Sequence, residues 1–459
     1  MYAFCQVLIL NILKKNGKFM KYQSTLLRGT LILTTAGFLS RIMGFFYRIF
    51  LANTIGAEGM GIYQMIFPIY SVCFSLCASG IETAISKLTA EKYAIGKTKE
   101  ASEILCTGLF LTLMLAFSCS FFIYHFADKI SILFLKEPRC AQLIKILAFT
   151  IPFGTTQSCI CGYYFGMRKT IVPSSAQLIE QILRILCVFT VFHIYLTNGM
   201  EISPVIAVIG LVFGEFASLL FTITCFSFHS HLKIYQPFKK TISYLKEILP
   251  LSIPLTASRI CVNLLVSLEA AMIPNALRSY GMDSSKALSV YGILNGMALP
   301  FILFPNALTG SISMMLLPTV SESQAEGTLK SLKRTLSKTF SFCITLGIGC
   351  LLFFLFFGKF LGAFIFSNEL AGKFLQTLSW ICPFLYLNTT LNSVLNGLGK
   401  TSITFFTGIS SLLIRIVFIF FIMPKLGIFG YLLALLISQL YVTFFSLYWL
   451  SHYFKFDHS

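Results

Sequence analysis

Charged residues are scarce in this chain. Only 11% of its 459 residues are Asp, Glu, Lys or Arg, whereas a soluble domain carries about 25% because its surface must face water. This shortage excludes a protein composed of about three soluble domains, which the length alone would suggest. Hydrophobic residues make up 56% of the chain, and its mean hydropathy is +0.82. The composition therefore indicates an integral membrane protein.

Groups that carry out chemistry are scarcer still. The chain has 17 acidic residues and 6 histidines, and they form no paired-carboxylate, Ser/His/Asp or Cys/His arrangement typical of catalysis. Gly399-Lys400-Thr401 resembles the end of a phosphate-binding loop, but Val394 stands where that motif requires Gly. We therefore expect no cofactor and no enzymatic activity. A membrane glycosyltransferase stays open, because its site can consist of a few loop residues.

The cysteines predict neither disulfides nor a metal site. Nearly all 14 lie in apolar segments, with Cys140 as the clearest exception. A buried Cys behaves as a small hydrophobic residue. Cys159 and Cys161 lie within an apolar span, and His229 and His231 have no further ligands nearby, so we expect no bound metal.

Long hydrophobic runs dominate what the chain does contain. A spanning helix needs about 20 mostly apolar residues, and charged clusters, Gly and Pro divide the sequence into twelve such runs. The runs are continuous and too long for the alternating strands of a barrel, so the predicted fold is all-α. The twelve predicted spans are residues 27–52, 60–85, 104–127, 142–165, 174–196, 204–226, 248–277, 289–317, 339–357, 374–397, 402–423 and 429–452.

The net charge of +18 comes from basic residues in the short loops between spans. Loops on the N-terminal side hold 21 Lys and Arg, against 8 in the alternate loops. Such a bias marks cytoplasmic loops, so we expect both termini in the cytoplasm and no nucleic-acid partner. Six basic residues remain inside the spans: Arg41, Arg48, Lys145, Arg184, Arg259 and Arg415.

The sequence also repeats itself. Pro152, Gly166, Lys169 and Arg184 recur 231 positions later as Pro383, Gly397, Lys400 and Arg415, and Ser40-Arg41-Ile42 recurs 218 positions later as Ser258-Arg259-Ile260. An offset of six helices preserves orientation, so the repeats are parallel. We predict an N-terminal extension (1–19), a six-helix lobe (20–226), a cytoplasmic linker (227–246), a second six-helix lobe (247–454) and a short tail (455–459).

Four arginines are predicted at mid-membrane depth. Counting about 1.5 Å per residue, Arg41, Arg184, Arg259 and Arg415 lie roughly 15 to 20 Å into a core about 30 Å thick. An arginine there costs at least about 2.5 to 3.5 kcal/mol unless it faces a cavity or a partner. All four are therefore expected to face inward.

The expected partners of these arginines differ. Arg184 follows Glu180 by four residues, so the two share a helix face and are predicted to form an intramembrane ion pair. Arg415 has Ser411 at the corresponding place. Its partner is expected on another helix, either Glu215 or a hydroxyl group.

Arg41 and Arg259 have no acidic neighbour within one turn. Two inward cations on the first helices of both lobes can converge on an anion, so we predict that they bind substrate. Arg48, seven residues after Arg41, either joins them or reaches to the interface. Glu269 is expected to pair with Arg41 or Arg259. The predicted substrate-binding residues are Arg41, Arg48, Arg259, Arg415 and Glu269.

Two further features concern the second, seventh and eighth spans. Glu82 lies near Lys87 at the inner end of the second span, which predicts an interfacial ion pair. Kinks in the seventh and eighth spans are predicted by Pro250, Pro254, Pro300, Pro305, Pro318, Gly292, Gly296 and Gly310.

Several motifs resemble a known group. They are Arg28-Gly-Thr-Leu-Ile-Leu, Ser40-Arg-Ile-Met-Gly-Phe-Phe-Tyr-Arg48, Ile55-Gly-Ala-Glu-Gly-Met-Gly-Ile-Tyr63, Ala84-Ile-Ser-Lys87 and Leu288-Ser-Val-Tyr-Gly-Ile-Leu-Asn-Gly-Met-Ala-Leu-Pro300. Together they resemble the stage V sporulation protein B branch of polysaccharide biosynthesis transporters. This branch belongs to the multidrug/oligosaccharidyl-lipid/polysaccharide exporter superfamily, and the similarity extends over residues 20–454.

The resemblance implies two six-helix lobes around a central cavity in the bacterial cytoplasmic membrane. It also implies translocation of undecaprenyl-diphosphate-linked sugars and, for this branch, supply of peptidoglycan precursor to the spore cortex. Ser40-Arg41 is similar to the first-helix element of lipid II flippases, although Arg48 stands one residue further along than the second arginine there. Many relatives have fourteen helices, the last two forming a groove for the lipid tail, whereas twelve are predicted here.

The sequence thus predicts a flippase for undecaprenyl-diphosphate-linked oligosaccharide or lipid II. A cation-coupled multidrug exporter of the same fold is the main alternative, and it should show unpaired carboxylates at mid-membrane depth. A membrane glycosyltransferase or polymerase should show a large polar loop with acidic residues. The predicted loops are at most about 20 residues long and basic.

Overall fold

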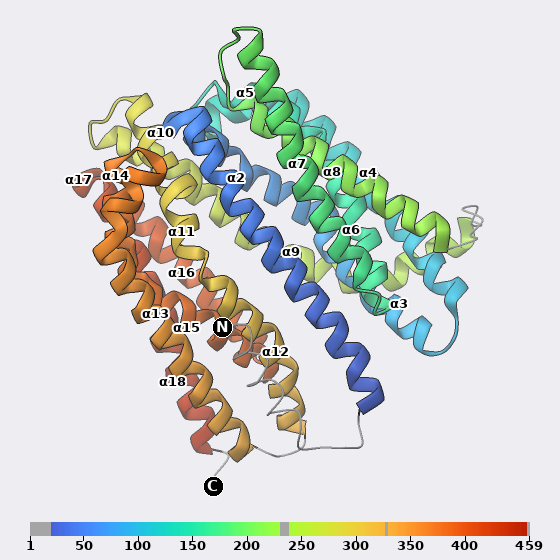
Figure 1. Cartoon of the computed structure of the whole chain (residues 1–459). Coiled ribbons are helices and arrows are strands. Elements are labelled where there is room, and N and C mark those ends of the chain that lie inside the picture. Colours follow the sequence, from blue (N-terminus) through green and yellow to red (C-terminus); the bar gives the residue numbers. More distant parts are fainter. Residues whose placement is uncertain (1–19, 230–237, 326–328, 457–459) are drawn as a thin grey trace.

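The computed structural model describes residues 20–229, 238–325 and 329–456 (Figure 1). Every regular element within these ranges is a helix, as the hydrophobic runs predict. Residues 1–19, the centre of the predicted linker and the last three residues of the predicted tail lie outside the described ranges. We call residues 20–229 the first half and residues 238–456 the second half.

The first half contains the elements α2 to α8. They are α2 (Met20–Phe74), the π-helix η1 (Ser75–Ser79), α3 (Gly80–Ala94), α4 (Thr98–Lys129), the π-helix η2 (Ile130–Phe134), α5 (Cys140–Ala148), α6 (Thr150–Gly166), α7 (Ile171–Thr197) and α8 (Val205–His229). Two predicted spans lie in α2 and its continuation, because the chain bends at Gly56 (φ 71°) and stays helical on both sides. Positive φ is accessible to Gly without the steric cost that a side chain brings.

The second half contains the elements α9 to α18. They are α9 (Phe238–Ser279), α10 (Ser284–Gly292), the π-helix η3 (Ile293–Ala298), α11 (Leu299–Leu303), α12 (Asn306–Ala325), α13 (Leu329–Phe366), α14 (Glu369–Leu378), the 3₁₀-helix η4 (Ser379–Ile381), α15 (Cys382–Gly397), α16 (Thr401–Phe421), α17 (Met423–Leu426) and α18 (Ile428–Phe456). The predicted eighth span is broken before Pro305, whereas the seventh continues through Pro250, Pro254 and Pro274 as one helix.

The described residues contain nine helices that are long and apolar enough to cross a membrane, or ten if the bent pair α5–α6 forms one span. One of these helical stretches, residues 32–94, is 63 residues long and holds two predicted spans. The predicted span 374–397 is divided between α14, η4 and α15. The multi-pass helical architecture is therefore confirmed, while the number twelve stays a prediction.

The bundle has two ends. We call the end that holds the start of α2 and the turns after α3, α6 and α15 the proximal face, and the opposite end, with the bend at Gly56 and the loop 135–139, the distal face (Figure 1). Figure 1 shows the first half on one side of the bundle and most of the second half on the other. Helix α9 crosses between them, because its proximal part packs on α3 and α4 and it also packs on α16.

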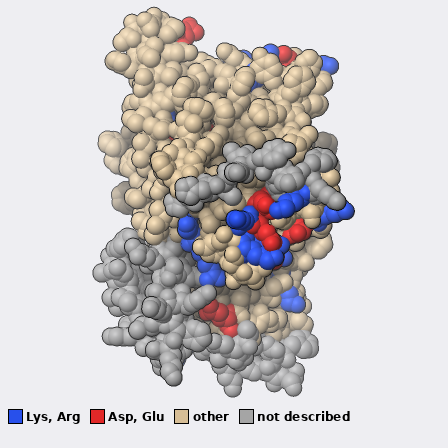
Figure 2. Space-filling view, turned by 90° about the vertical axis from the view of Figure 1, so that its right-hand side faces the viewer, with Lys and Arg blue, Asp and Glu red and all other residues tan. Residues whose placement is uncertain are grey.

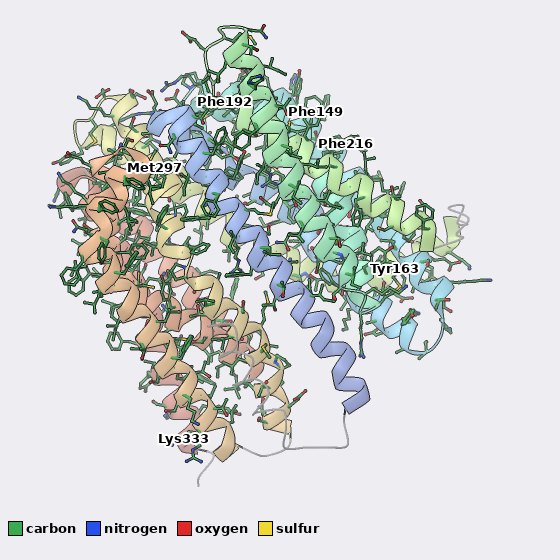
Figure 3. All side chains as sticks on the ribbon, viewed as in Figure 1. Phe149, Tyr163, Phe192, Phe216, Met297 and Lys333 are labelled. Atoms are coloured by element: carbon green, nitrogen blue, oxygen red, sulfur yellow. The ribbon has the colours of Figure 1, made fainter. Side chains whose placement is uncertain are left out.

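The surface between the faces is apolar. Aromatic side chains such as Phe149 and Phe216 stand out from the first half, and Lys333 lies at the proximal end (Figure 3). Figure 2 shows a cluster of charged side chains toward the proximal end, a wide uncharged surface above it, and a few further charged side chains along the upper edge. Two ion pairs of this region join α3 and α4 to α9, namely Lys92 with Glu247 and Lys240 with Glu103. Glu100 pairs with Lys92 and Lys97 within the α3–α4 turn.

The turns of the two halves match at the predicted spacing of 231 residues. Arg168 (φ 62°) and Gly399 (φ 73°) hold the same left-handed conformation, as do Lys136 (φ 54°) and Ser367 (φ 49°). Helices α6 and α15 also end 231 positions apart. The internal repeat is thus visible in the backbone, while the lobe boundaries at residues 226 and 247 stay a prediction.

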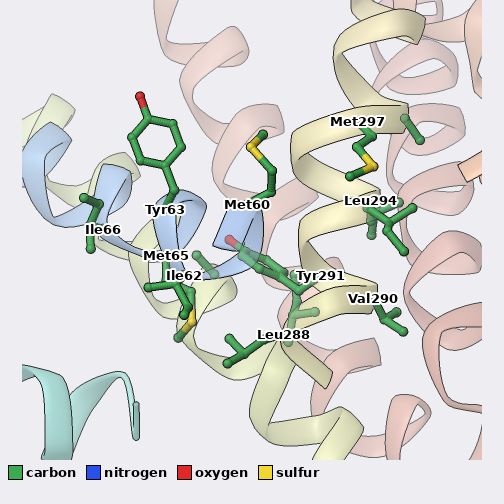
Figure 4. Close-up of a cluster of buried hydrophobic side chains, with 14 of the residues drawn as sticks. Met60, Ile62, Tyr63, Met65, Ile66, Leu288, Val290, Tyr291, Leu294 and Met297 are labelled. Atoms are coloured by element: carbon green, nitrogen blue, oxygen red, sulfur yellow. The ribbon is translucent and has the colours of Figure 1, made fainter. Parts of the chain in front are cut away.

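The largest hydrophobic cluster is shared by both halves and lies toward the distal face. It brings Met60 and Met65 of α2 against Tyr291, Leu294 and Met297 of α10 and η3 (Figure 4). Separate clusters occur toward the proximal face: one contains first-half residues with Tyr244 and Ile248 of α9, and the other contains second-half residues alone. The two halves therefore share a core distally and pack mostly on themselves proximally.

Two glycines let the halves approach at the shared core. A Cβ atom at Gly61 would lie 2.1 Å from the Leu288 carbonyl oxygen, and one at Gly292 would lie 2.1 Å from the Ala57 carbonyl oxygen. Both distances are far below any real contact between a Cβ atom and an oxygen, and the obstacle is backbone that cannot turn away. Small residues permit such close helix contacts in membranes.

We predict that Gly61→Ala and Gly292→Ala each lower the thermal unfolding midpoint of the detergent-solubilised protein. Overpacking of this kind costs about 1 to 3 kcal/mol because the helices must move apart. Gly408→Ala is the control, since Gly408 has open space around its would-be Cβ. Equal midpoints for all three variants would show that α2 and α10 are not in close contact.

Candidate functional site

Arg41 lies between the two halves. It is on the proximal part of α2 and is exposed, and its guanidinium Nη1 lies 3.4 Å from the position that a Cβ atom at Gly310 of α12 would occupy. Within the described ranges, no residue gives Arg41 a hydrogen bond or an ion pair. Arg41 therefore has no acidic partner on its own helix, as predicted, and it lies at the boundary between α2 of the first half and α12 of the second half.

Arg48 lies seven residues further along α2 and is also exposed. The part of the chain that the structure describes offers it no hydrogen bond or ion pair either. Arg41 and Arg48 are thus two cations on one helix whose charge is not neutralised by a neighbouring carboxylate.

Arg259, which corresponds to Arg41 in the repeat, has a different environment. Its Nη1 donates to the Ser79 carbonyl oxygen at 2.9 Å, and its Nη2 donates to the Thr83 hydroxyl at 3.4 Å. One turn later, the amide nitrogen of Asn263 donates to the Ser75 hydroxyl at 2.5 Å. Ser75 and Ser79 both belong to the π-helix η1, whose hydrogen bonds depart from the regular ladder of an α-helix.

This contact joins α9 to the first half. Gly80 makes it possible, because a Cβ atom there would lie 2.1 Å from the Thr256 hydroxyl and 2.5 Å from the Ser252 carbonyl oxygen. Sequence symmetry predicted equal roles for Arg41 and Arg259. Their surroundings differ because α9 packs on η1 and α3, whereas α2 meets Gly310, which has no side-chain acceptor.

Glu269 and Arg415 pair with each other inside the second half. Arg415 Nη1 lies 3.0 Å from Glu269 Oε1, and the Tyr431 hydroxyl donates to the same oxygen at 2.8 Å. Glu269 is only 5% exposed. The expected partner of Arg415 on another helix is thus present, but it is Glu269 and not Glu215. Glu269 does not pair with Arg41 or Arg259 among the described residues. The packing of α9 on α16 brings the two charges together.

The first half contains the predicted pair of Arg184 and Glu180 within α7. Glu215 of α8 lies in the same half and accepts a hydrogen bond from the Tyr70 hydroxyl at 3.2 Å. Gly154 makes room for this contact, because a Cβ atom there would lie 2.6 Å from the Tyr70 hydroxyl oxygen. Each half thus holds a half-buried arginine from matching helices, with a carboxylate beside it.

A cavity of about 260 Å³ lies inside the first half. Its polar lining consists of Glu82, Gln157, Ser158, Gln177, Glu180 and Glu215. Glu82 accepts a hydrogen bond from the Ser158 hydroxyl at 2.6 Å, so the expected pair with Lys87 is wrong; Lys87 lies near Glu91 instead. The sequence places Glu82, Glu180 and Glu215 on three different predicted spans, and no pattern in it shows that they line one cavity.

No group of His, Cys, Asp and Glu side chains within the described ranges is arranged to hold a metal ion. The thirteen cysteines in those ranges are free thiols. The arrangement instead offers two kinds of charged site: exposed arginines between the halves, and three carboxylates around the cavity of the first half.

We predict that Glu269→Leu strongly destabilises the protein. It leaves the Arg415 guanidinium without its carboxylate among apolar helices, and removing one partner of such a pair costs about 3 to 5 kcal/mol. The double variant Glu269→Leu with Arg415→Leu should recover most of that loss, because no charge is then left unpaired. Thermal unfolding in detergent measures both, and an unchanged midpoint for the single variant would contradict the prediction.

The fold matches those of solved membrane transporters. A structure titled lipid II flippase MurJ in an inward closed conformation aligns with a TM-score of 0.72 at 18% identity, covering 92% of this chain and 87% of that one. An inward-facing multidrug resistance MATE family transporter of the MOP superfamily also gives 0.72 at 13% identity, covering 91% of this chain and 95% of that one. These similarities establish the fold.

Comparison of sequences also identifies similar proteins. The chain is 28% identical over 428 residues to stage V sporulation protein B of Bacillus subtilis, covering 92% of this chain and 82% of that protein. It is 22% identical over 426 residues to the lipid II flippase MurJ of the same organism, covering 86% and 76%. The MatE family matches residues 260–421. The polysaccharide biosynthesis protein family matches residues 26–324, more than half of the sequence, and the chain therefore belongs to that family.

Proposed function

We propose that this protein is a flippase that moves undecaprenyl-diphosphate-linked oligosaccharide or lipid II across the bacterial cytoplasmic membrane. The observation that carries the proposal is the exposed Arg41 between α2 and α12, without a carboxylate partner among the described residues. An arginine at mid-membrane depth is costly unless it faces a water-filled cavity or an anion. A diphosphate is an anion that suits this position.

Arginine also fits a diphosphate geometrically. Its planar fork of donors binds two phosphate oxygens at once, which the single ammonium of lysine cannot do. Arg48 supplies a second cation on the same helix. Arg259 joins them when α9 moves away from η1 and its hydrogen bonds to Ser79 and Thr83 are released. Arg415 and Glu269 neutralise each other, so in this proposal they stabilise the packing of the second half.

The relatives support a lipid-linked substrate. One bears the name stage V sporulation protein B and another the name lipid II flippase. We therefore propose supply of peptidoglycan or surface-polysaccharide precursor as the physiological role, with the spore cortex as the specific destination. The arrangement of charges favours transport without an enzymatic reaction.

The proposed direction follows from the proposed orientation. The loop bias of 21 to 8 basic residues favours a cytoplasmic proximal face. Apart from α9, whose Tyr244 and Ile248 join the first-half cluster, the proximal ends of the two halves have separate cores, so the substrate headgroup would enter from that side. A diphosphate carries about two negative charges, each worth about 2.3 kcal/mol per 100 mV. An inside-negative potential therefore favours outward movement, and the arginines lower the barrier without supplying the driving force.

We predict that Arg41→Ala abolishes flipping of a fluorescent lipid II in proteoliposomes, while Arg41→Lys keeps part of the rate. Alanine removes the cation, and lysine retains the charge but loses the bidentate geometry. Flipping is measured as loss of fluorescence to a membrane-impermeant quencher. Arg334→Ala is the matched control, because it removes the same charge from the proximal end of α13. A normal rate for Arg41→Ala would refute the anion-binding role.

A second candidate function is cation-coupled export of organic cations, which the carboxylate-lined cavity favours. Only one positive side chain, Arg184, pairs with its three glutamates among the described residues. The two functions predict opposite sensitivities. In a flippase, Glu215→Gln should spare lipid II flipping driven by membrane potential, whereas in an exporter it should abolish ethidium accumulation driven by a sodium or proton gradient.

This comparison is made in one preparation. Wild type, Arg41→Ala and Glu215→Gln are reconstituted in parallel, and both cargoes are assayed. Ethidium transport that requires Glu215 and ignores Arg41, with no lipid II flipping, would replace the flippase proposal by the exporter.

A further inference from the structure

The distal face contains a network of charged side chains centred on Glu137. Glu137, in the loop between η2 and α5, is 3% exposed. Its carboxylate accepts hydrogen bonds from Arg139 Nε at 2.7 Å, from Arg278 Nη2 at 3.3 Å and from the Ser284 hydroxyl at 3.3 Å. Three donors on one buried carboxylate form a specific site rather than a casual surface pair.

The network extends to a second carboxylate. Glu58 of α2 accepts from Arg139 Nη1 at 2.6 Å and from the Ser285 hydroxyl at 2.7 Å. Arg278 in turn donates to the Lys136 carbonyl oxygen at 2.9 Å and to the Ser284 hydroxyl at 2.9 Å. Arg139 thus joins the two carboxylates.

These contacts connect the halves. Glu58, Glu137 and Arg139 belong to the first half, whereas Arg278, Ser284 and Ser285 belong to the end of α9 and the start of α10 in the second half. Nearby, the Asn53 amide donates to the Ile365 carbonyl oxygen at the end of α13 at 3.0 Å. Five side-chain contacts between carboxylate, amide or guanidinium groups and the opposite half therefore lie at the distal face: Arg278–Glu137, Arg278–Lys136, Ser284–Glu137, Ser285–Glu58 and Asn53–Ile365.

The electrostatics of Glu137 agree with this geometry. Burial acts to raise its pKa, but the hydrogen bonds and charge of Arg139 outweigh that effect and hold the pKa below the usual range. The carboxylate is therefore charged at neutral pH, as its arginine partners require.

We propose that this network is a latch that holds the distal face closed and that must open in each transport cycle. A bundle whose halves share a core distally and, apart from α9, have separate cores proximally can expose its interior distally only if the distal contacts break. The apolar contacts of α2 with α10 beneath the network are non-directional. The latch adds directional bonds that form only when the two halves are in register, so it defines the closed state.

The inference rests on the proposed flippase function, in which the headgroup enters at the proximal face and moves outward. Its test requires no substrate, so failure of the latch and failure of the proposed cargo are distinguishable. Hydrogen exchange, read by mass spectrometry on the whole chain in lipid nanodiscs, reports opening at named backbone amides. The informative amides are those of residues 57–61 in α2 and 288–292 in α10, which lie on either side of the shared contact.

Three variants test the latch. Arg278→Ala removes a second-half donor and Glu137→Gln removes the first-half charge, and each should speed exchange at residues 57–61 and 288–292 about ten-fold, the effect of losing one charge-assisted hydrogen bond. Combined, they should act by less than the sum of the two single effects, because both variants remove the Arg278–Glu137 contact. Asp128→Asn is the matched control: it breaks the distal pair of Asp128 with Lys145, which lies wholly within the first half.

The distribution of the effect decides the outcome. Faster exchange confined to the α2–α10 contact, with α7 and α8 unchanged and the control silent, is the result that we expect. Unchanged exchange in Arg278→Ala would overturn the proposal. Equal acceleration throughout the bundle would overturn it too, because the network would then contribute to overall stability without controlling one face. Additive effects in the double variant would show that Arg278 and Glu137 do not act on each other.

Discussion

A charge between apolar helices needs a partner, and most of this structure can be understood as the ways in which that requirement is met. Arg184 finds Glu180 one turn away, Arg415 finds Glu269 on a neighbouring helix, and Arg259 uses a backbone oxygen of the opposite half. Each solution holds particular helices together. Arg41 is the exception among these four, since no described residue neutralises it, and for this reason the proposed function depends on it.

Close backbone contact is the second condition for these partnerships. Gly80 allows α9 to reach η1, and Gly154 allows Tyr70 to reach Glu215. Glycine adds no apolar surface of its own, so its value here is the approach it permits. The glycines therefore set the distance between helices, and the charged and amide side chains then select one register.

Local features of the structure could be predicted from the sequence, and features that depend on helix neighbours could not. The Glu180–Arg184 pair follows from four-residue spacing alone, and the matching turns at Arg168 and Gly399 follow from the repeat. The Arg415–Glu269 pair joins residues 146 positions apart, so it depends on which helices pack together. Glu82 likewise finds Ser158 on α6, although Lys87 is closer along the chain. Periodicity places a residue on a helix face but does not say what that face meets.

The equal spacing of the left-handed turns limits how the two halves can evolve. From Lys136 to Arg168 the first half keeps the same number of residues as the second half does from Ser367 to Gly399. Deleting one residue in α6 would turn the remainder of that helix by about 100° and shift it by about 1.5 Å along its axis. Ser158 would then leave Glu82, and Gly162 would no longer face the backbone that it now approaches. A substitution such as that between Arg168 and Gly399 keeps this spacing, whereas an insertion or deletion between the two turns of one half would break such contacts.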